Sequence, residues 1–294
     1  MTRRLLLVLL ASVCLALAVA SGARAQAPTS TPQAFPVCTR PELQAAADSY
    51  VAAQKAGDVS KMAFADKTTF LENMAASDKG TGLWNTPLPI ALSRSFLDTT
   101  RCKTFTEIVV TEGGHPYAIG TRLYVDRGKV TRVDSLVTDK GDWLFNATAY
   151  LKYSSAEDWS APKPEARVSA QELINAANAY LDLFSDKFVS VPWGRPCVRL
   201  EGGLYSNRKK DPDATCEVGI PAGVLYIVNR DYIVDTEQGV INVFCRFGNS
   251  TTGMPDSHTF RLVNGKLTNV HTLSVNMNPN APSPQSDDDG GIVR

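Results

Sequence analysis

The sequence has few histidines and no excess of charge of either sign. Thirty Lys and Arg balance thirty Asp and Glu, and only three of the 294 residues are histidines. A neutral chain is not typical of a general nucleic-acid binder, so we expect no nucleic-acid partner. The few histidines, with no HExxH and no CxxC motif, argue against a metal site. We therefore also expect no metal.

Several signatures of well-known enzyme classes are missing too. The chain has no GxSxG motif, no P-loop and no Rossmann glycine pattern. Nothing therefore indicates a serine hydrolase, an NTPase or a dinucleotide-dependent enzyme, and we expect no cofactor. Hydrophobic residues make up 44% of the chain, alongside 20 glycines and 17 prolines. This composition predicts a globular protein with a sizeable core.

Long apolar runs are lacking except at the N-terminus. The run from Leu5 to Ala20 follows Arg3 and Arg4 and ends before Ala23-Arg24-Ala25. We expect residues 1–25 to be a secretory signal peptide, since the run is shorter than the roughly 20 residues that span a bilayer. The alternative is an N-terminal membrane anchor. Cleavage would leave 27 Lys and Arg against 30 Asp and Glu, a charge of −3, on an extracellular or periplasmic protein with no membrane contact.

What the chain does contain is a copy of itself. Five positions of a helical pattern recur 130 residues later: Glu42, Leu43, Ala46, Ala47 and Tyr50 return as Glu172, Leu173, Ala176, Ala177 and Tyr180. In each copy the Leu, the two Ala and the Tyr fall at i, i+3, i+4 and i+7, which is one face of an amphipathic helix. Downstream, residues 128–134 match 265–271, and each begins as a hairpin turn before a β-rich run.

Each copy predicts one helix, a helical or irregular stretch, and then several strands. The expected strands are 104–111, 117–125 and 129–137 in the first copy, and 226–234, 240–247, 257–263 and 266–275 in the second. Helices followed by strands indicate an α+β fold with an antiparallel sheet. We expect domains at 38–155 and 168–275, a linker at 156–167, a flexible segment at 26–37 and a disordered acidic tail at 276–294.

The cysteines fit this division in an oxidising compartment. Cys14 would leave with the signal peptide, so five would remain. We expect disulfides Cys38–Cys102 and Cys197–Cys216, because each pair would lie within one repeat. Cys245 would stay unpaired in a strand, and we expect it to be buried rather than to act as a nucleophile.

The first copy resembles a known superfamily at residues 50–58, followed by Phe64-Ala65-Asp66 and Glu72. The resemblance is to the ketosteroid-isomerase and SnoaL-like polyketide-cyclase branch of the nuclear-transport-factor-two-like (NTF2-like) superfamily, and both copies fit it. It implies two cone-shaped, cystatin-like domains, each with helices packed on a curved antiparallel sheet around a mostly apolar pocket. The tandem arrangement looks like the family dimer fused into one chain, a pseudo-dimer. The chain also resembles secreted, uncharacterised two-repeat proteins of fungi and some bacteria.

The resemblance also suggests site residues. In ketosteroid isomerases a helix-one tyrosine hydrogen-bonds the substrate oxyanion and a carboxylate moves the proton, which points to Tyr180 with Glu201 and, as secondary candidates, Tyr50 with Glu72. Cyclase-like members place His or an acid on the last strands, which adds His258 and His271 in copy two and Asp134 in copy one.

These residues leave two functions open. The first is a secreted protein that binds a small organic molecule and acts on it as a cofactor-independent isomerase, cyclase or lyase, with copy two as the better site. The second is a non-catalytic ligand-binding or interaction protein, in which the same tyrosines, acids and histidines are core or surface residues. Arg94 and Arg230 match each other; they could bind a ligand carboxylate or form structural ion pairs.

Overall fold

A computed structural model describes residues 38–217, 219–278 and 283–293 of the protein. The expected signal peptide, 1–25, and the expected flexible segment, 26–37, lie outside these residues. Within them, no helix is both long enough and apolar enough to cross a membrane.

The first repeat is one long helix and a six-stranded sheet in the described part of the chain. Its elements are α1 (Arg40–Ala56), β1 (Phe64–Glu72), β2 (Ala75–Ser77), β3 (Leu92–Asp98), β4 (Lys103–Val110), β5 (Tyr117–Asp126) and β6 (Lys129–Thr138). The sheet order is β2-β1-β6-β5-β4-β3. All neighbours are antiparallel except β1 and β6, which run parallel.

The second repeat has the same topology. Its elements are α3 (Ala170–Asp182), β7 (Trp193–Glu201), β8 (Leu204–Tyr205), β9 (Ile227–Asp235), β10 (Val240–Phe247), β11 (Met254–Val263) and β12 (Lys266–Ser274), in the order β8-β7-β12-β11-β10-β9. Again one pair, β7 and β12, is parallel. The structure thus confirms the predicted α+β class and tandem repeat, with one parallel pair in each sheet that the antiparallel prediction did not include.

Both long helices begin in the same way. Thr39 caps α1 and Ser169 caps α3, and each forms a reciprocal capping box with the Glu three residues later. The repeated Leu, Ala, Ala and Tyr positions are buried in both helices. They pack on one face of each sheet, so α1 and α3 each cover a separate hydrophobic core.

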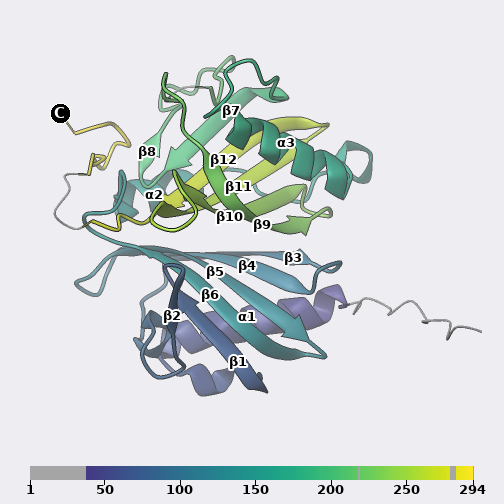
Figure 1. Ribbon diagram of the computed structural model, residues 1–294, viewed down its shortest axis with the longest axis vertical. Coiled ribbons are helices and arrows are strands. Elements are labelled where there is room, and N and C mark those ends of the chain that lie inside the picture. Colours follow the sequence, from purple (N-terminus) through teal and green to yellow (C-terminus); the bar gives the residue numbers. More distant parts are fainter. Residues whose placement is uncertain (1–37, 218, 279–282, 294) are drawn as a thin grey trace, which may run out of the picture. The chain divides into compact units, whose positions relative to one another are not determined.

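The other faces of the two sheets pack against each other, and Figure 1 shows the sheets facing with α1 and α3 on their far sides. Two further apolar clusters fill this interface. One includes Phe105 of repeat one and Phe244 of repeat two, whose rings meet edge to face at 6.1 Å, and the other includes Ala118 and Leu273. The repeats therefore form the pseudo-dimer that the sequence predicted.

Two aspartates tie the edge strands of this pseudo-dimer together. Asp235 accepts a hydrogen bond from the Leu97 amide at 2.8 Å, and Asp98 accepts one from the Val234 amide at 2.9 Å. Arg40 adds two bonds to Asp235, each 2.9 Å long. Because each strand makes the same bond to the other, β3 and β9 are related by a local two-fold axis.

Both predicted disulfides are present, joining Cys38 to Cys102 and Cys197 to Cys216. Cys245 is free and buried on β10. Other features differ from prediction. Strands β1, β3 and β7 were not predicted. They lie in the stretches after the first helix of each repeat, which were expected to be helical or irregular. Helix α2 (Ala147–Ser154) follows the first sheet and packs into the interface.

The described part of the expected loose tail, 283–293, packs against the rest of the chain. Ser286 is buried and donates to the Leu144 carbonyl, and Lys152 pairs with Asp289. These polar contacts, with the loop after β6 and with α2, hold residues 283–293 in place although the stretch has few apolar side chains.

Candidate functional site

The second repeat contains a cavity of about 270 Å³ between its sheet and the loop before β9. Apolar side chains supply much of its wall: Trp143, Phe184, Pro221, Leu225, Phe247 and Met254. The polar lining comes from Arg199, Glu201, His258, Thr272 and Ser274. An apolar pocket with a few converging polar groups is the usual form of a small-molecule site.

Two predicted site residues, Glu201 and His258, line this cavity, and a third, Tyr180, packs against His258. Tyr180 lies on the inner face of α3, Glu201 ends β7, and His258 lies on β11. The rings of Tyr180 and His258 are 5.7 Å apart between centroids. Both residues are at most 2% exposed, whereas 16% of the Glu201 side chain is accessible.

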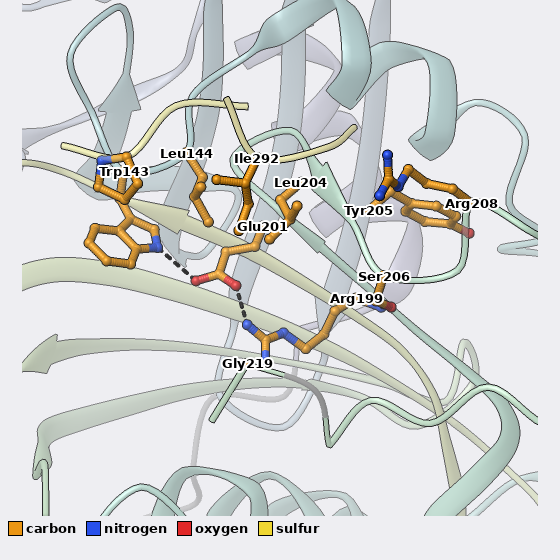
Figure 2. A pocket seen from close by; sticks show the side chains of 11 residues that line it. Trp143, Leu144, Arg199, Glu201, Leu204, Tyr205, Ser206, Arg208, Gly219 and Ile292 are labelled. Atoms are coloured by element: carbon orange, nitrogen blue, oxygen red, sulfur yellow. Dashed lines mark hydrogen bonds and ion pairs between the residues drawn. The ribbon is translucent and has the colours of Figure 1, made fainter. Parts of the chain in front are cut away.

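Glu201 is held by two partners (Figure 2). It pairs with Arg199, two residues earlier on β7, and accepts a 2.8 Å hydrogen bond from the Trp143 indole. Burial alone would raise the pKa of Glu201, but the attraction of Arg199 and these hydrogen bonds outweigh it and lower the pKa. Glu201 is therefore a carboxylate at neutral pH.

The loop that carries Trp143 reaches this site because the end of β7 gives it room. Gly202 has φ of +62°, and a Cβ added there would come 2.3 Å from the Trp143 carbonyl oxygen. A second cavity of about 400 Å³ shares Trp143, Arg199, Glu201 and Gly219 with the first and is bordered by Ile292 of the tail.

Three polar atoms without hydrogen-bond partners cluster around His258, which lines the 270 Å³ cavity. They are the Tyr180 hydroxyl, the His258 Nδ1 and the Oδ2 of Asp256, all buried. Asp256 Oδ2 lies 3.2 Å from His258 Nδ1, close enough for an ion pair. Burial raises the pKa of Tyr180, so the phenol keeps its proton. Such unpaired buried groups are costly unless a ligand completes them.

In repeat one the corresponding side chains have hydrogen-bond partners. The Tyr50 hydroxyl bonds Thr121 at 2.7 Å, and Thr121 bonds Ser135 at 2.7 Å. Glu72 accepts from the Leu83 amide at 2.7 Å. Trp84 is buried in the same core. The secondary candidates Tyr50 and Glu72 therefore have structural partners within repeat one.

His271 does not join the other candidates, because alternate residues on β12 face opposite sides of the sheet. It lies between the two sheets, with Nε2 at 2.6 Å from Glu157 and Nδ1 at 3.0 Å from Glu107. Burial lowers the pKa of His271, but the two carboxylates raise it to about 9. The pKa of Glu107 is correspondingly lowered to about 2, against the effect of burial.

The other candidates also lie away from the cavity. Asp134 pairs with Arg132 at 2.6 Å. Arg94 bonds Glu107 and Ser154, while Arg230 pairs with Asp182 at 2.7 Å. Both arginines thus take part in the structural ion pairs that the sequence left open. The predicted match between Arg94 and Arg230 is off by one residue. Asp98 and Asp235 occupy equivalent positions in the two repeats, and the same offset makes Asp231 the equivalent of Arg94.

Sequence reasoning missed three residues of this site: Trp143, Arg199 and Asp256. Arg199 and Glu201 sit at i and i+2 on a strand, a spacing that places two side chains on one face, but the strand itself was not predicted. Trp143 comes from a loop after repeat one, and no local signal links it to repeat two.

The order of elements and strands is the same in both repeats. Residues 166–274 match a family model described as a domain of unknown function, DUF8021. The chain is similar to a crystallised NTF-2 like protein of unknown function from Burkholderia xenovorans LB400, with 16% identity, 34% of this chain and 84% of that chain covered, and a TM-score of 0.26. No curated protein matches the chain.

Proposed function

We propose that the protein is secreted and binds a small, partly apolar organic molecule in the cavity of its second repeat, where its side chains carry out acid/base isomerisation, cyclisation or elimination. The observation that carries this proposal is the contrast between the repeats. The Tyr50 hydroxyl is satisfied inside repeat one, whereas the Tyr180 hydroxyl is buried without a partner, and its ring packs against His258, which lines the cavity. The two disulfides are compatible with export.

The roles follow from the charge of each group. Tyr180 keeps its proton and would donate a hydrogen bond to a ligand oxygen on which negative charge develops. Glu201 is ionised and would accept a proton from the adjacent carbon and return it. His258 would donate a further hydrogen bond from its ring. The apolar wall would exclude water from the reacting atoms.

One observation favours binding without catalysis. The pair with Arg199 lowers the pKa of Glu201, so this carboxylate is a weaker base than a carboxylate whose pKa is raised toward about 7. In a pure binding protein, Arg199 and Glu201 would only shape the cavity wall. The second candidate function is therefore a non-catalytic carrier of the same class of molecule.

Ligand capture followed by a turnover assay separates these functions. The purified protein is equilibrated with a metabolite extract, and the molecules it retains are identified by mass spectrometry. We expect an enriched small molecule with wild type and with Glu72→Gln, the matched control in repeat one. Glu201→Gln should abolish conversion of that molecule while thermal unfolding stays cooperative.

Retention without conversion by wild type would establish the carrier. Unchanged conversion by Glu201→Gln would refute the role of this carboxylate. Equal loss of retention in Glu72→Gln and Glu201→Gln would contradict the assignment of the site to repeat two.

A further inference from the structure

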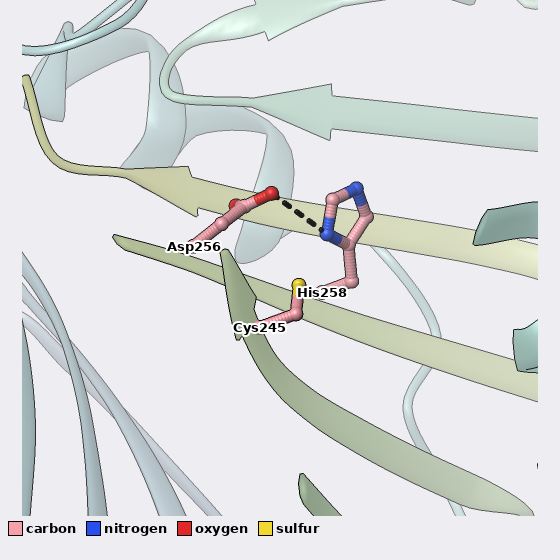
Figure 3. A group of neighbouring side chains, drawn as sticks. All are labelled: Cys245, Asp256 and His258. Atoms are coloured by element: carbon pink, nitrogen blue, oxygen red, sulfur yellow. Dashed lines mark ion pairs between the residues drawn. The ribbon is translucent and has the colours of Figure 1, made fainter. Parts of the chain in front are cut away.

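Two neighbouring strands of repeat two place a cysteine and an aspartate opposite each other inside the core. Cys245 on β10 pairs with Asp256 on β11, and both are completely buried. His258 follows two residues after Asp256, so its side chain lies on the same face of the sheet. Among the His, Cys, Asp and Glu side chains that the structure describes, these three form the one group in which a nitrogen, sulfur or carboxylate oxygen of each lies within 4.8 Å of the others (Figure 3).

The fold does not require polar residues at these places. In repeat one the equivalent cross-strand pair is Ile108 and Ile119, both buried in the core under α1, and Thr121 stands two residues later. The same backbone therefore packs well with two isoleucines. Repeat two has exchanged them for a thiol and a carboxyl.

The protein alone offsets the cost of this exchange only in part, through the 3.2 Å approach of His258 Nδ1 to Asp256 Oδ2. Asp256 Oδ1 accepts one hydrogen bond from Ser274 at 3.0 Å, but Oδ2 has none. The nearby His258 Nδ1 also has none. A fully buried carboxylate is strongly unfavourable unless paired or bound to a metal.

We propose that Cys245, Asp256 and His258 bind one zinc ion through Sγ, Oδ2 and Nδ1. Thiolate, imidazole nitrogen and carboxylate oxygen are the ligand types that zinc takes, and three protein ligands leave a fourth position for water or a ligand oxygen. Binding releases the thiol proton of Cys245 to solvent. Two anionic ligands then balance the 2+ charge, so the buried site is neutral.

The zinc site adjoins the proposed ligand site. His258 lines the 270 Å³ cavity, and Figure 3 shows its Nε2 on the side of the ring away from Asp256 and Cys245. With Nδ1 on zinc, Nε2 carries the proton and donates toward the cavity. Zinc binding goes beyond the proposed function and is tested without any organic ligand or turnover.

The test is a zinc titration of the full protein, purified and stripped of metal under argon so that Cys245 stays reduced and both disulfides stay intact. Competition with a chromogenic chelator should show one zinc per chain and a rise in the unfolding temperature. Cobalt(II) in place of zinc should give a thiolate charge-transfer band in the near ultraviolet. Cys245→Ser should abolish that band, and His258→Gln should weaken zinc binding at least about tenfold.

Two variants control for misfolding and for adventitious binding. The triple variant Cys245→Ile, Asp256→Ile and His258→Thr installs the repeat-one residues, and it should fold without binding zinc. His115→Gln removes a histidine outside the site and should bind zinc like wild type. Absence of stoichiometric binding, or equal affinity in wild type and a folded triple variant, would overturn the proposal.

Discussion

The buried histidine between the two sheets makes a specific prediction about stability and pH. His271 is 1% exposed and contacts two carboxylates, Glu107 on β4 and Glu157 after α2, while Arg94 on β3 pairs with Glu107. Tyr150 on α2 completes the contacts at 3.3 Å. Two carboxylates and two cations balance only while His271 is protonated.

The magnitude follows from the pKa of His271, which rises from an ordinary 6.5 to about 9. Each unit corresponds to about 1.4 kcal/mol, so the protonated histidine contributes about 3 kcal/mol to the free energy of unfolding. Because the folded pKa is raised, this contribution is fully present below pH 6.5. It is lost as the pH rises from 6.5 through 9.

Urea unfolding at several pH values between 6 and 9.5 measures this loss. The wild-type unfolding free energy should fall by about 3 kcal/mol more than that of His271→Gln, which cannot titrate. Because the variant also leaves two buried carboxylates facing each other, it should be less stable than wild type at pH 6.

An NMR titration of the His271 ring gives an independent readout on the unmodified protein. It should show a midpoint near 9. A midpoint at or below 6.5, or parallel pH profiles for wild type and variant, would refute the reasoning.

Three further predictions concern the interface, the disulfides and the open site. Asp235→Ala removes two bonds from Arg40 and one from the Leu97 amide, and should cost about 3 kcal/mol in urea unfolding. Cys102→Ser opens a link across 64 residues and should cost about 4 kcal/mol, against about 3 kcal/mol for Cys216→Ser across 19; equal losses would contradict the chain-entropy argument. The double variant Asp256→Ile and His258→Thr offers Tyr180 the hydroxyl that Thr121 offers Tyr50 and leaves no buried carboxylate without its ion-pair neighbour, so calorimetry should show a higher unfolding temperature together with weaker ligand retention.

The sequence predicted the repeated parts of the fold best, because both copies carried the same signal. Capping boxes and the apolar faces of α1 and α3 are local, and the alternating strands from β4 to β6 and from β9 to β12 lie near their predicted bounds. Strands β1 and β7 were missed because each pairs in parallel with a strand more than 50 residues away and shows little alternation. A strand partner so far away in the sequence leaves no hydrophobic periodicity in a segment of about 11 to 18 residues.

The candidate residues that lie close together were predicted on different grounds. Tyr180 lies on the predicted helix face and His258 on a predicted strand, whereas Glu201 ends β7, which the sequence did not predict, and was named through the resemblance. His271 was placed on the wrong side because a shift of one residue along a strand reverses the face. Its carboxylate partners come from repeat one and α2, so the sequence contained no local signal for them.

The divergence between the copies explains why one fold would keep a site in only one of its two halves. Repeat one fills its core with Ile108, Ile119 and Trp84, and closes Tyr50 with a hydroxyl partner. The repeat-one equivalents of Tyr180, Cys245, Asp256 and His258 are therefore apolar or hydrogen-bonded to each other. Repeat two instead leaves three buried polar atoms without hydrogen-bond partners around His258, which lines a cavity. Since each such group lowers stability, this cluster is the part of the second repeat that a bound ion or ligand would complete.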